Sequence, residues 1–410
     1  MKHILSIIII GLSLHPAFAQ DEDAFDVRVK GFVDTYQAVQ TDKPNKWMSS
    51  RTRVRGELTI EKGNVGAFVS ANAIYNSIVK DQSGFYLREA YGYFSVGNWD
   101  IRAGRQIVTW GVADAMRLTD IISPMDFTEY LAQDYDDIRV PVTGVRVKYV
   151  MPKWAAEIIA IPIPSFFELP TDKSNPWAIS FPGINSPYLI NVNSVPAKKI
   201  CNSEYGGKFS VFLPGVDFSF SALHTWNKMP VFTHKTDEAG ELVFTGEHRR
   251  MTMLGADASV PVGKLVIRGE FAEYLDEAQT PSAIGAIPPR KNTTNALLGV
   301  DWYPGNDWTF AVQYSHKYIS GFSSEVSGFR NSGMATVRVA KDLLRNTLNL
   351  STFAYIDVTN GGIYNRLYAE YAVTDQIHAF LGYDFFHADA GMFAMYSKNS
   401  EIWLKLKYSF

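Results

Sequence analysis

Apolar and polar side chains alternate along segment after segment of this chain, and this pattern limits its fold more than any other feature. In one segment Arg51, Arg53 and Arg55 alternate with Thr52, Val54 and Gly56. The same alternation recurs near residues 65–73, 216–222, 265–271, 348–351, 366–371 and 401–410. Period two is the geometry of a β-strand whose two faces meet different surroundings. The pattern therefore predicts an all-β protein built on a large sheet with one apolar face.

Short turn-forming segments alternate with longer polar connections between these strands. The short segments are 61–64, 97–98, 151–154, 213–215, 261–263, 304–307, 341–345 and 373–375. The longer connections are 41–47, 76–84, 104–141, 164–203, 227–246, 276–292, 319–331, 358–362 and 387–399. This order predicts a transmembrane antiparallel up-and-down β-barrel of about 18 strands, with about 16 possible because the first strand and the region 140–165 are poorly patterned. Short turns at one rim and long loops at the other are typical of such barrels.

The first 20 residues, MKHILSIIIIGLSLHPAFAQ, predict the compartment. They combine Lys2, an apolar run and an Ala17–Phe18–Ala19 site, which is the pattern of a secretory signal peptide. We therefore expect Sec-type export, a signal peptide at 1–19 and a single barrel domain at 20–410. No later apolar run is long enough to predict a transmembrane helix.

The last strand carries a second targeting signal. Ile402, Leu404 and Leu406 alternate with Trp403 and Lys405, and the strand ends with Tyr408 and Phe410. The stretch resembles the C-terminal insertion signal of Gram-negative outer-membrane barrels. That resemblance implies an integral protein of the outer membrane, with its lipid, lipopolysaccharide and the barrel-assembly machinery as partners. Tyr408 and Phe410 are the residues that the resemblance assigns to the signal.

Composition argues against several other classes of protein. Removal of the signal peptide takes away one lysine and leaves 38 basic against 42 acidic residues, a formal charge of −4 that does not favour nucleic acid. The single cysteine, Cys201, excludes an intrachain disulfide. None of the six histidines beyond the signal peptide has partners spaced for nucleophilic catalysis, so we expect no enzyme and no cofactor. The DYDD stretch at 134–137 matches no calcium loop, so no metal site is assigned.

A row of basic residues is predicted on the lumen face. Arg51, Arg53 and Arg55, here called the arginine ladder, lie two apart on one strand. Three further residues are expected to face the lumen on neighbouring strands: Arg102, Arg146 and Lys148. Guanidinium groups in a row can pass an anion from one donor set to the next. The alternative is that they pair with wall acids such as Glu57, Glu89, Asp100 and Glu157 and only stabilise the wall.

The connection 104–141 is too long and too apolar for an open outer loop, which predicts a folded insertion. Folded into the lumen, its acids would face the arginine ladder and form a constriction or a plug; a lid outside the barrel is the alternative. The residues assigned to it are Arg105, Trp110, Asp114, Asp120, Asp126, Asp134, Asp136, Asp137 and Arg139, with Glu129 among its acids. The connection 164–203 is predicted to be a long extracellular loop that carries Cys201 as a lone thiol.

Three stretches of the same region, GRQIVTWG (104–111), ISPMDF (122–127) and YDDIRVP (135–141), carry a family resemblance. The chain resembles, over roughly 85–165, an uncharacterised group of porin-like outer-membrane barrels with a GRQ…WG segment. The resemblance implies hydrophobic or aromatic nutrients as a substrate class and assigns no ligand residues.

These features together predict a porin-like channel for passive or facilitated uptake of small solutes, with anions favoured by the arginine ladder. Two alternatives remain open. One is a plugged channel specific for hydrophobic or aromatic compounds, and the other is a barrel that serves a secretion or adhesion partner. Assembly into a homo-oligomer is also left open by the sequence.

Overall fold

The computed structural model describes residues 25–410, apart from 114, 136, 182–183, 185–186 and 193. The predicted signal peptide, Asp114 and Asp136 therefore lie outside the described residues. The strands are β1 (Asp26–Gln40), β2 (Trp47–Lys62), β3 (Val65–Asn76), β4 (Gly84–Val96), β5 (Trp99–Gln106), β6 (Val142–Met151), β7 (Trp154–Ile163), β8 (Tyr188–Asn191), β9 (Glu204–Leu213), β10 (Val216–Trp226), β11 (Val231–Thr236), β12 (Leu242–Glu247), β13 (Arg250–Val262), β14 (Leu265–Ala278), β15 (Arg290–Gly305), β16 (Trp308–Ile319), β17 (Asn331–Leu343), β18 (Leu348–Asp357), β19 (Gly362–Ala372), β20 (Ile377–His387) and β21 (Glu401–Ser409). Four single-turn 3₁₀ helices lie in the connections: η1 (Lys80–Gln82), η2 (Tyr130–Ala132), η3 (Ile200–Asn202) and η4 (Ala394–Tyr396).

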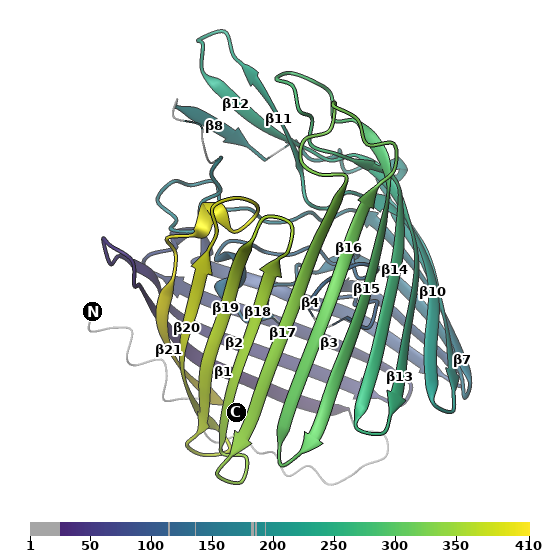
Figure 1. Ribbon diagram of the computed structural model, residues 1–410. Helices are drawn as coiled ribbons and strands as arrows, with labels where there is room; N and C mark the ends of the chain where they lie inside the picture. Colours follow the sequence, from purple (N-terminus) through teal and green to yellow (C-terminus); the bar gives the residue numbers. More distant parts are fainter. Residues whose placement is uncertain (1–24, 114, 136, 182–183, 185–186, 193) are drawn as a thin grey trace.

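Eighteen of these strands form one closed antiparallel barrel, which confirms the predicted fold class and strand number (Figure 1). Each barrel strand pairs with its neighbours in chain order, and β21 pairs with β1 to close the ring. Strands β8, β11 and β12 form a separate three-stranded sheet above the rim that carries the long connections. Among the described residues, no helix has the length and apolar character needed to cross a membrane.

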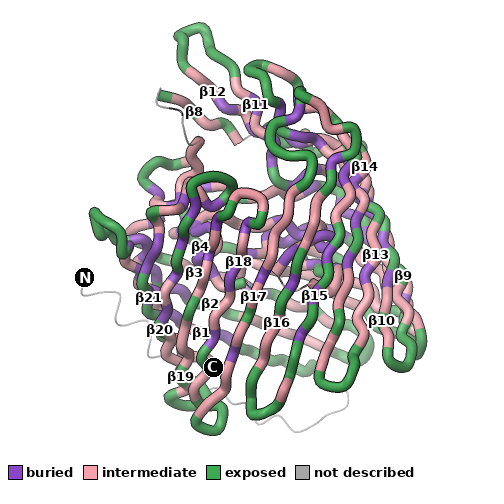
Figure 2. Tube along the Cα trace, viewed as in Figure 1, coloured by how far each residue is buried: buried purple, intermediate pink, exposed green. Residues whose placement is uncertain are grey.

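Local sequence explains the narrow turns at the opposite rim. Asn306 and Asp307, in the turn between β15 and β16, both adopt a positive φ, of 51° and 59°. Asparagine and aspartate tolerate this left-handed backbone, and two such residues in succession match the twist of a hairpin. Figure 2 shows these turns as exposed, together with the other short turns at this rim. We call this end the short-turn rim and the other end the long-loop rim.

The two faces of the wall follow the alternation. On β21, Ile402 and Leu404 are about half exposed at 50% and 47%, whereas Trp403 is 2% exposed. The outer face is apolar, as a lipid-facing surface requires, and the inner face carries the polar and charged residues.

Two apolar clusters fill part of the barrel interior. The first joins Val108, Trp110, Met116, Leu118 and Ile122, from the connection after β5, to the inner faces of β7, β10, β13, β14 and β15. The second joins Tyr130 and Trp177 to the inner faces of β1, β19, β20 and β21. A barrel of this size would enclose an aqueous channel if nothing filled it, so the connections inside it decide what can pass.

The long connections differ from their predicted bounds by up to three residues. The connection predicted at 227–246 runs to 249 and contains β11 and β12, and the one predicted at 276–292 spans 279–289. Strand β5 extends to Gln106, so the inserted connection begins at residue 107 and Arg105 belongs to the barrel wall. We call the connection 107–141 the lumen loop. The connection 164–203 has the predicted bounds and contains β8 and η3.

Candidate functional site

The arginine ladder points into the barrel from β2. Arg51, Arg53 and Arg55 are 5%, 4% and 7% exposed, because alternation puts all three on the inner face. Strand β1 lies beside them in register, with Tyr36 opposite Arg51 and Phe32 opposite Arg55. The guanidinium carbon of Arg51 lies 5.1 Å from the ring centre of Tyr36. The ladder is thus buried against aromatic rings, where an unpaired charge would be costly.

Acids of the lumen loop neutralise most of this charge. Arg51 Nη1 lies 3.0 Å from Glu129 Oε2. Asp137 bridges two rungs, with 2.5 Å from its Oδ2 to Arg53 Nη1 and 2.5 Å from its Oδ1 to Arg55 Nη2. Arg53 also forms an ion pair with Asp34 of β1. The ladder is therefore the surface on which the lumen loop docks.

Electrostatics holds the docking carboxylates in their ionised form. Burial would raise the pKa of Asp137, but Arg53 and Arg55 outweigh burial and hold this pKa well below its usual range. Burial would also raise the pKa of Asp134, but the charge of Lys405, whose Nζ lies 2.8 Å from Asp134 Oδ2, lowers this pKa to about 2. Opposite charges at this distance favour the ionised form of both partners.

The wall acids proposed as alternative partners are used elsewhere. Glu89 accepts the backbone N–H of Ile107 at 2.8 Å, and Glu157 accepts the indole N–H of Trp110 at 2.9 Å. Asp100 pairs with Arg102 of the same strand at 3.2 Å. Across the described part of the chain, no ion pair joins Glu57, Glu89, Asp100 or Glu157 to the ladder.

The other basic residues expected in the lumen lie nearer the short-turn rim. Arg102 of β5 lies directly opposite Arg146 of β6, and Lys148 is two residues further along β6. The buried Nε of Arg146 has no acceptor among the described residues. These residues do not contact the ladder, so they form a second basic region on the lumen face.

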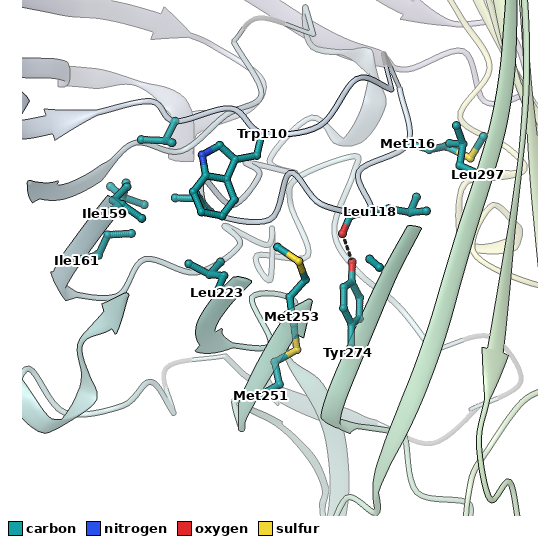
Figure 3. Close-up of a cluster of buried hydrophobic side chains, with 14 residues drawn as sticks. Trp110, Met116, Leu118, Ile159, Ile161, Leu223, Met251, Met253, Tyr274 and Leu297 are labelled. Atoms are coloured by element: carbon teal, nitrogen blue, oxygen red, sulfur yellow. Dashed lines mark hydrogen bonds between the residues drawn. The ribbon is translucent and has the colours of Figure 1, made fainter. Parts of the chain in front are cut away.

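The lumen loop crosses the barrel and is attached to several walls. In Figure 3, Trp110 of its first part lies beside Ile159 of β7, Leu118 lies beside Tyr274 of β14, and Met116 lies beside Leu297 of β15. The hydroxyl of Tyr274 on β14 donates to the carbonyl of Leu118 at 2.6 Å, and Tyr355 on β18 donates to Ala115 at 3.0 Å. Farther along the loop, Arg366 of β19 donates to the carbonyl of Ala132 at 3.0 Å.

The predicted loop residues therefore have three different environments. Asp134 and Asp137 bind the wall, and Trp110 anchors the apolar cluster. Asp120 and Arg139 pair with each other at 2.5 Å, and Arg117 binds the same carboxylate at 3.1 Å, so these residues hold the loop's own shape. Asp126 accepts from Thr128 within the loop. Arg105 of β5 donates to the carbonyl of Leu87 at 3.0 Å.

Several site residues had no sequence signal. Asp34 and Tyr36 lie on the poorly patterned first strand, and Arg366 and Asp384, a buried pair at 3.3 Å, lie on strands whose charges looked ordinary. Alternation alone put Lys405 on the inner face, but it could not indicate that its partner is Asp134, 271 residues away.

Among the cavities that the described residues form, two border the lumen loop. The larger, of about 450 Å³, lies toward the long-loop rim, between the loop and the wall of β13, β14 and β16. Charged and apolar groups share its lining, including Arg117, Lys228, Glu277, Lys317, Met229, Met251, Phe167 and Tyr274. The smaller, of about 150 Å³, lies beside the ladder. Within the described ranges no group of three or more histidine, cysteine, aspartate or glutamate residues is placed to hold a metal ion.

Part of the chain matches a known protein family. Residues 80–155 match a family model described as a protein of unknown function, DUF1302, and this match overlaps the segment on which the family resemblance rests. No curated protein matches the chain.

Solved outer-membrane channels match across almost the whole length. OpdO of Pseudomonas aeruginosa is 11% identical with a TM-score of 0.55, covering 94% of this chain and 97% of its own. OccAB3 of Acinetobacter baumannii is 12% identical with a TM-score of 0.54, covering 94% and 99%. OccK2 (OpdF) of P. aeruginosa, solved in complex with glucuronate, is 10% identical with a TM-score of 0.54, covering 94% and 98%. The chain thus has the fold of outer-membrane porins.

Proposed function

We propose that the chain is an outer-membrane channel for small solutes, narrowed by the lumen loop. The bridge from Asp137 to Arg53 and Arg55 carries this proposal, because it ties the loop across the lumen to the wall. The fold likeness to outer-membrane channels supports the same class of function.

Small anions are the solutes that we propose. Most of the ladder's charge is balanced, but Arg102, Arg146 and Lys148 add a second basic region along the inner wall. All three side chains are partly exposed, so their cationic groups can bind the carboxylate of a passing anion. Glucuronate, the molecule with which OccK2 was solved, is a small carboxylate of this kind.

We also infer that the protein catalyses no reaction. We further infer that the barrel-assembly machinery inserts it by recognising Tyr408 and Phe410. Outer-membrane lipid and lipopolysaccharide are the surroundings that the apolar outer face suits. We also propose assembly into a homo-oligomer, which the molecular mass of the purified protein in detergent solution would test.

Single-channel conductance in a planar bilayer, with a salt gradient, tests the proposal. We expect small, stable steps with a preference for anions over cations. Replacement of Arg102, Arg146 and Lys148 with serine should lower that preference, and replacement of Arg51, Arg53 and Arg55 should also loosen the loop and raise conductance. A correctly folded barrel that never conducts would contradict an open channel.

A second candidate is a channel for hydrophobic or aromatic compounds. It is favoured by the lining of the 450 Å³ cavity, where Met229, Met251, Phe167 and Tyr274 lie beside charged groups. A cavity of this size with mostly fixed walls suits a small organic molecule. Block of the ion current by an aromatic acid at concentrations where glucuronate has no effect would favour this candidate.

A further inference from the structure

The inner face of β17 carries an arginine, Arg338, that the lumen loop leaves uncovered. Two residues before it, Thr336 is 3% exposed and lies opposite Tyr355 of β18. Tyr355 donates to the carbonyl of Ala115 in the lumen loop at 3.0 Å. Arg338 follows on the same face toward the short-turn rim, and its side chain is exposed. Arg338 is therefore the first inner-face residue of β17 on the short-turn side of this loop attachment.

No acid neutralises Arg338 within the described part of the chain, where its side chain forms neither an ion pair nor a hydrogen bond. Its neighbours in register are Ala311 of β16 and Phe353 of β18, and neither is charged. The next acid along this row of the sheet is Asp301 of β15, opposite Ala311. Asp301 Oδ2 lies 2.7 Å from Nη2 of Arg268, so this acid is already paired. The charge of Arg338 is thus free to act on solutes in the lumen.

The other basic side chains on the inner faces of β16 to β19 are paired. Lys317 Nζ of β16 lies 2.9 Å from Glu277 Oε2, and Arg366 Nη1 of β19 lies 3.3 Å from Asp384 Oδ2. An ion pair cancels most of the field that each charge projects into the lumen, whereas a lone exposed guanidinium projects its whole charge. Among the described residues of these four strands, Arg338 is the one inner-face cation without an acidic partner.

The second basic region faces Arg338 from the opposite wall. Half of the 18-stranded ring separates β17 from β5 in either direction, and β6 is paired with β5. Arg146 lies five residues before the end of β6, and Arg338 lies five residues before the end of β17. Each strand residue adds the same rise, so the two arginines lie at similar heights above the short-turn rim. Arg146 and Lys148 form no ion pair within the described ranges, so positive charge faces this part of the lumen from both sides.

We infer that Arg338, with Arg146 and Lys148 on the opposite wall, forms an anion site on the short-turn side of the lumen loop and determines which ions pass. An anion there is attracted from both walls, whereas a cation is repelled by both. The ligand class is a small anion, inorganic or carboxylate, because separated cations distinguish charge rather than shape. Selection of passing ions rests on the proposed channel function, whereas the positive potential beside Arg338 is measurable without ion flow.

The reversal potential of the purified full-length chain in planar bilayers, under a KCl gradient, tests the role of Arg338 in selection. Arg338→Gln should lower the anion-to-cation permeability ratio about twofold, and less at about 1 M salt, where screening is stronger. Arg338→Lys should keep most of the preference, because the charge remains. Lys341→Gln is the matched control, since it removes one charge from the outer face of the same strand, beside Trp308. Selectivity that Arg338→Gln changes no more than Lys341→Gln would overturn this role.

The reactivity of a nearby thiol tests the anion site without ion current. In a Cys201→Ser background, which removes the chain's own cysteine, Ala311→Cys places a thiol on the residue directly opposite Arg338. The rate constants of an anionic and a cationic methanethiosulfonate reagent are then compared. Adding Arg338→Gln should lower the anionic-to-cationic ratio about three- to tenfold, and adding Arg338→Lys should leave it nearly unchanged.

Each variant is first verified as folded by its heat-dependent gel mobility. A ratio that Arg338→Gln does not lower would overturn the anion site, whether or not the barrel conducts. A lowered ratio in a barrel that never conducts would support the anion site and contradict the channel function, so the two failures are distinguishable.

Discussion

The Oδ2 atom of Asp137 lies 2.5 Å from Nη1 of Arg53, although the two residues are 84 positions apart. Asp137 belongs to the lumen loop and Arg53 to the wall, so this ion pair fixes the loop across the barrel. Both side chains are largely buried, at 13% and 5% exposure. Removal of one partner from a buried pair leaves the other charge uncompensated, which is strongly destabilising.

Asp137→Asn should detach part of the lumen loop. The amide keeps the shape of the side chain but not its charge, so Arg55 loses its ion-pair partner. We expect a cost of about 3–5 kcal/mol in loop docking, with larger conductance steps and a stronger preference for anions in bilayer recordings.

Asp389→Asn is the control for this change, since Asp389 is an exposed acid in the connection after β20. Its conductance should equal that of the unchanged protein. If Asp137→Asn also conducts normally, the bridge to Arg53 is not what narrows the lumen.

Trp110→Ala should loosen the other attachment of the loop. The substitution removes a side chain that is 3% exposed from the first apolar cluster and leaves Glu157 without the indole donor. A loss of about 3–5 kcal/mol is typical of such a change. Trypsin cleavage after Arg117 should become faster, while the barrel's melting temperature changes little.

Trp308→Ala on the outer face of β16 provides the comparison, because this tryptophan is 40% exposed and touches no part of the loop cluster. The rate of trypsin cleavage in Trp110→Phe should lie between those of the two alanine variants, since phenylalanine keeps most of the packing. If the loop of Trp110→Ala stays resistant to trypsin, the ion pairs alone hold it.

Acidification to about pH 4 should not release the lumen loop. The pKa of Asp134 is lowered to about 2, and that of Asp137 is also held well below its usual range. A carboxylate with a depressed pKa contributes stability that is present above its unfolded value, 3.8 here, and is lost as pH falls through the folded value. Conductance and trypsin resistance should therefore be constant from about pH 7 to 4 and change only below about 3. A transition centred near pH 5 would mean that other groups hold the loop.

Gly31→Ala should weaken the seam that closes the barrel. Gly31 on β1 exchanges two backbone hydrogen bonds with Phe410, each 2.9 Å long. A Cβ atom there would lie 2.3 Å from the carbonyl oxygen of Arg55 and 2.6 Å from the Phe410 ring. We expect a loss of about 1–3 kcal/mol, seen as a lower melting temperature of the folded band on gels.

Gly56→Ala is a close control, because Gly56 lies directly opposite Gly31 and a Cβ there would meet nothing within 4 Å. It should melt like the unchanged protein. Equal melting of the two variants would mean that the seam adapts to a methyl group at Gly31.

Local chemistry made the barrel predictable. Alternation identifies a strand within about ten residues, and turns such as Asn306–Asp307 show where one strand ends. Both signals act between neighbours in the chain, so they survive without knowledge of the fold. These signals failed at the end of β5. The alternation of apolar and polar residues is lost near Arg105, so the connection was predicted to begin at residue 104, although β5 continues to Gln106.

The sequence by itself determined that Arg51, Arg53 and Arg55 share one inner face, because residues two apart in a strand always do. It did not determine their partners, since Glu57 on the same strand and Asp137 in a distant loop were both available acids. Only the tertiary structure determined that Asp137, and not Glu57, pairs with Arg53 and Arg55. The path of the lumen loop depends on where Trp110 and Tyr130 find apolar surface on opposite walls, and that surface exists only once the barrel has closed.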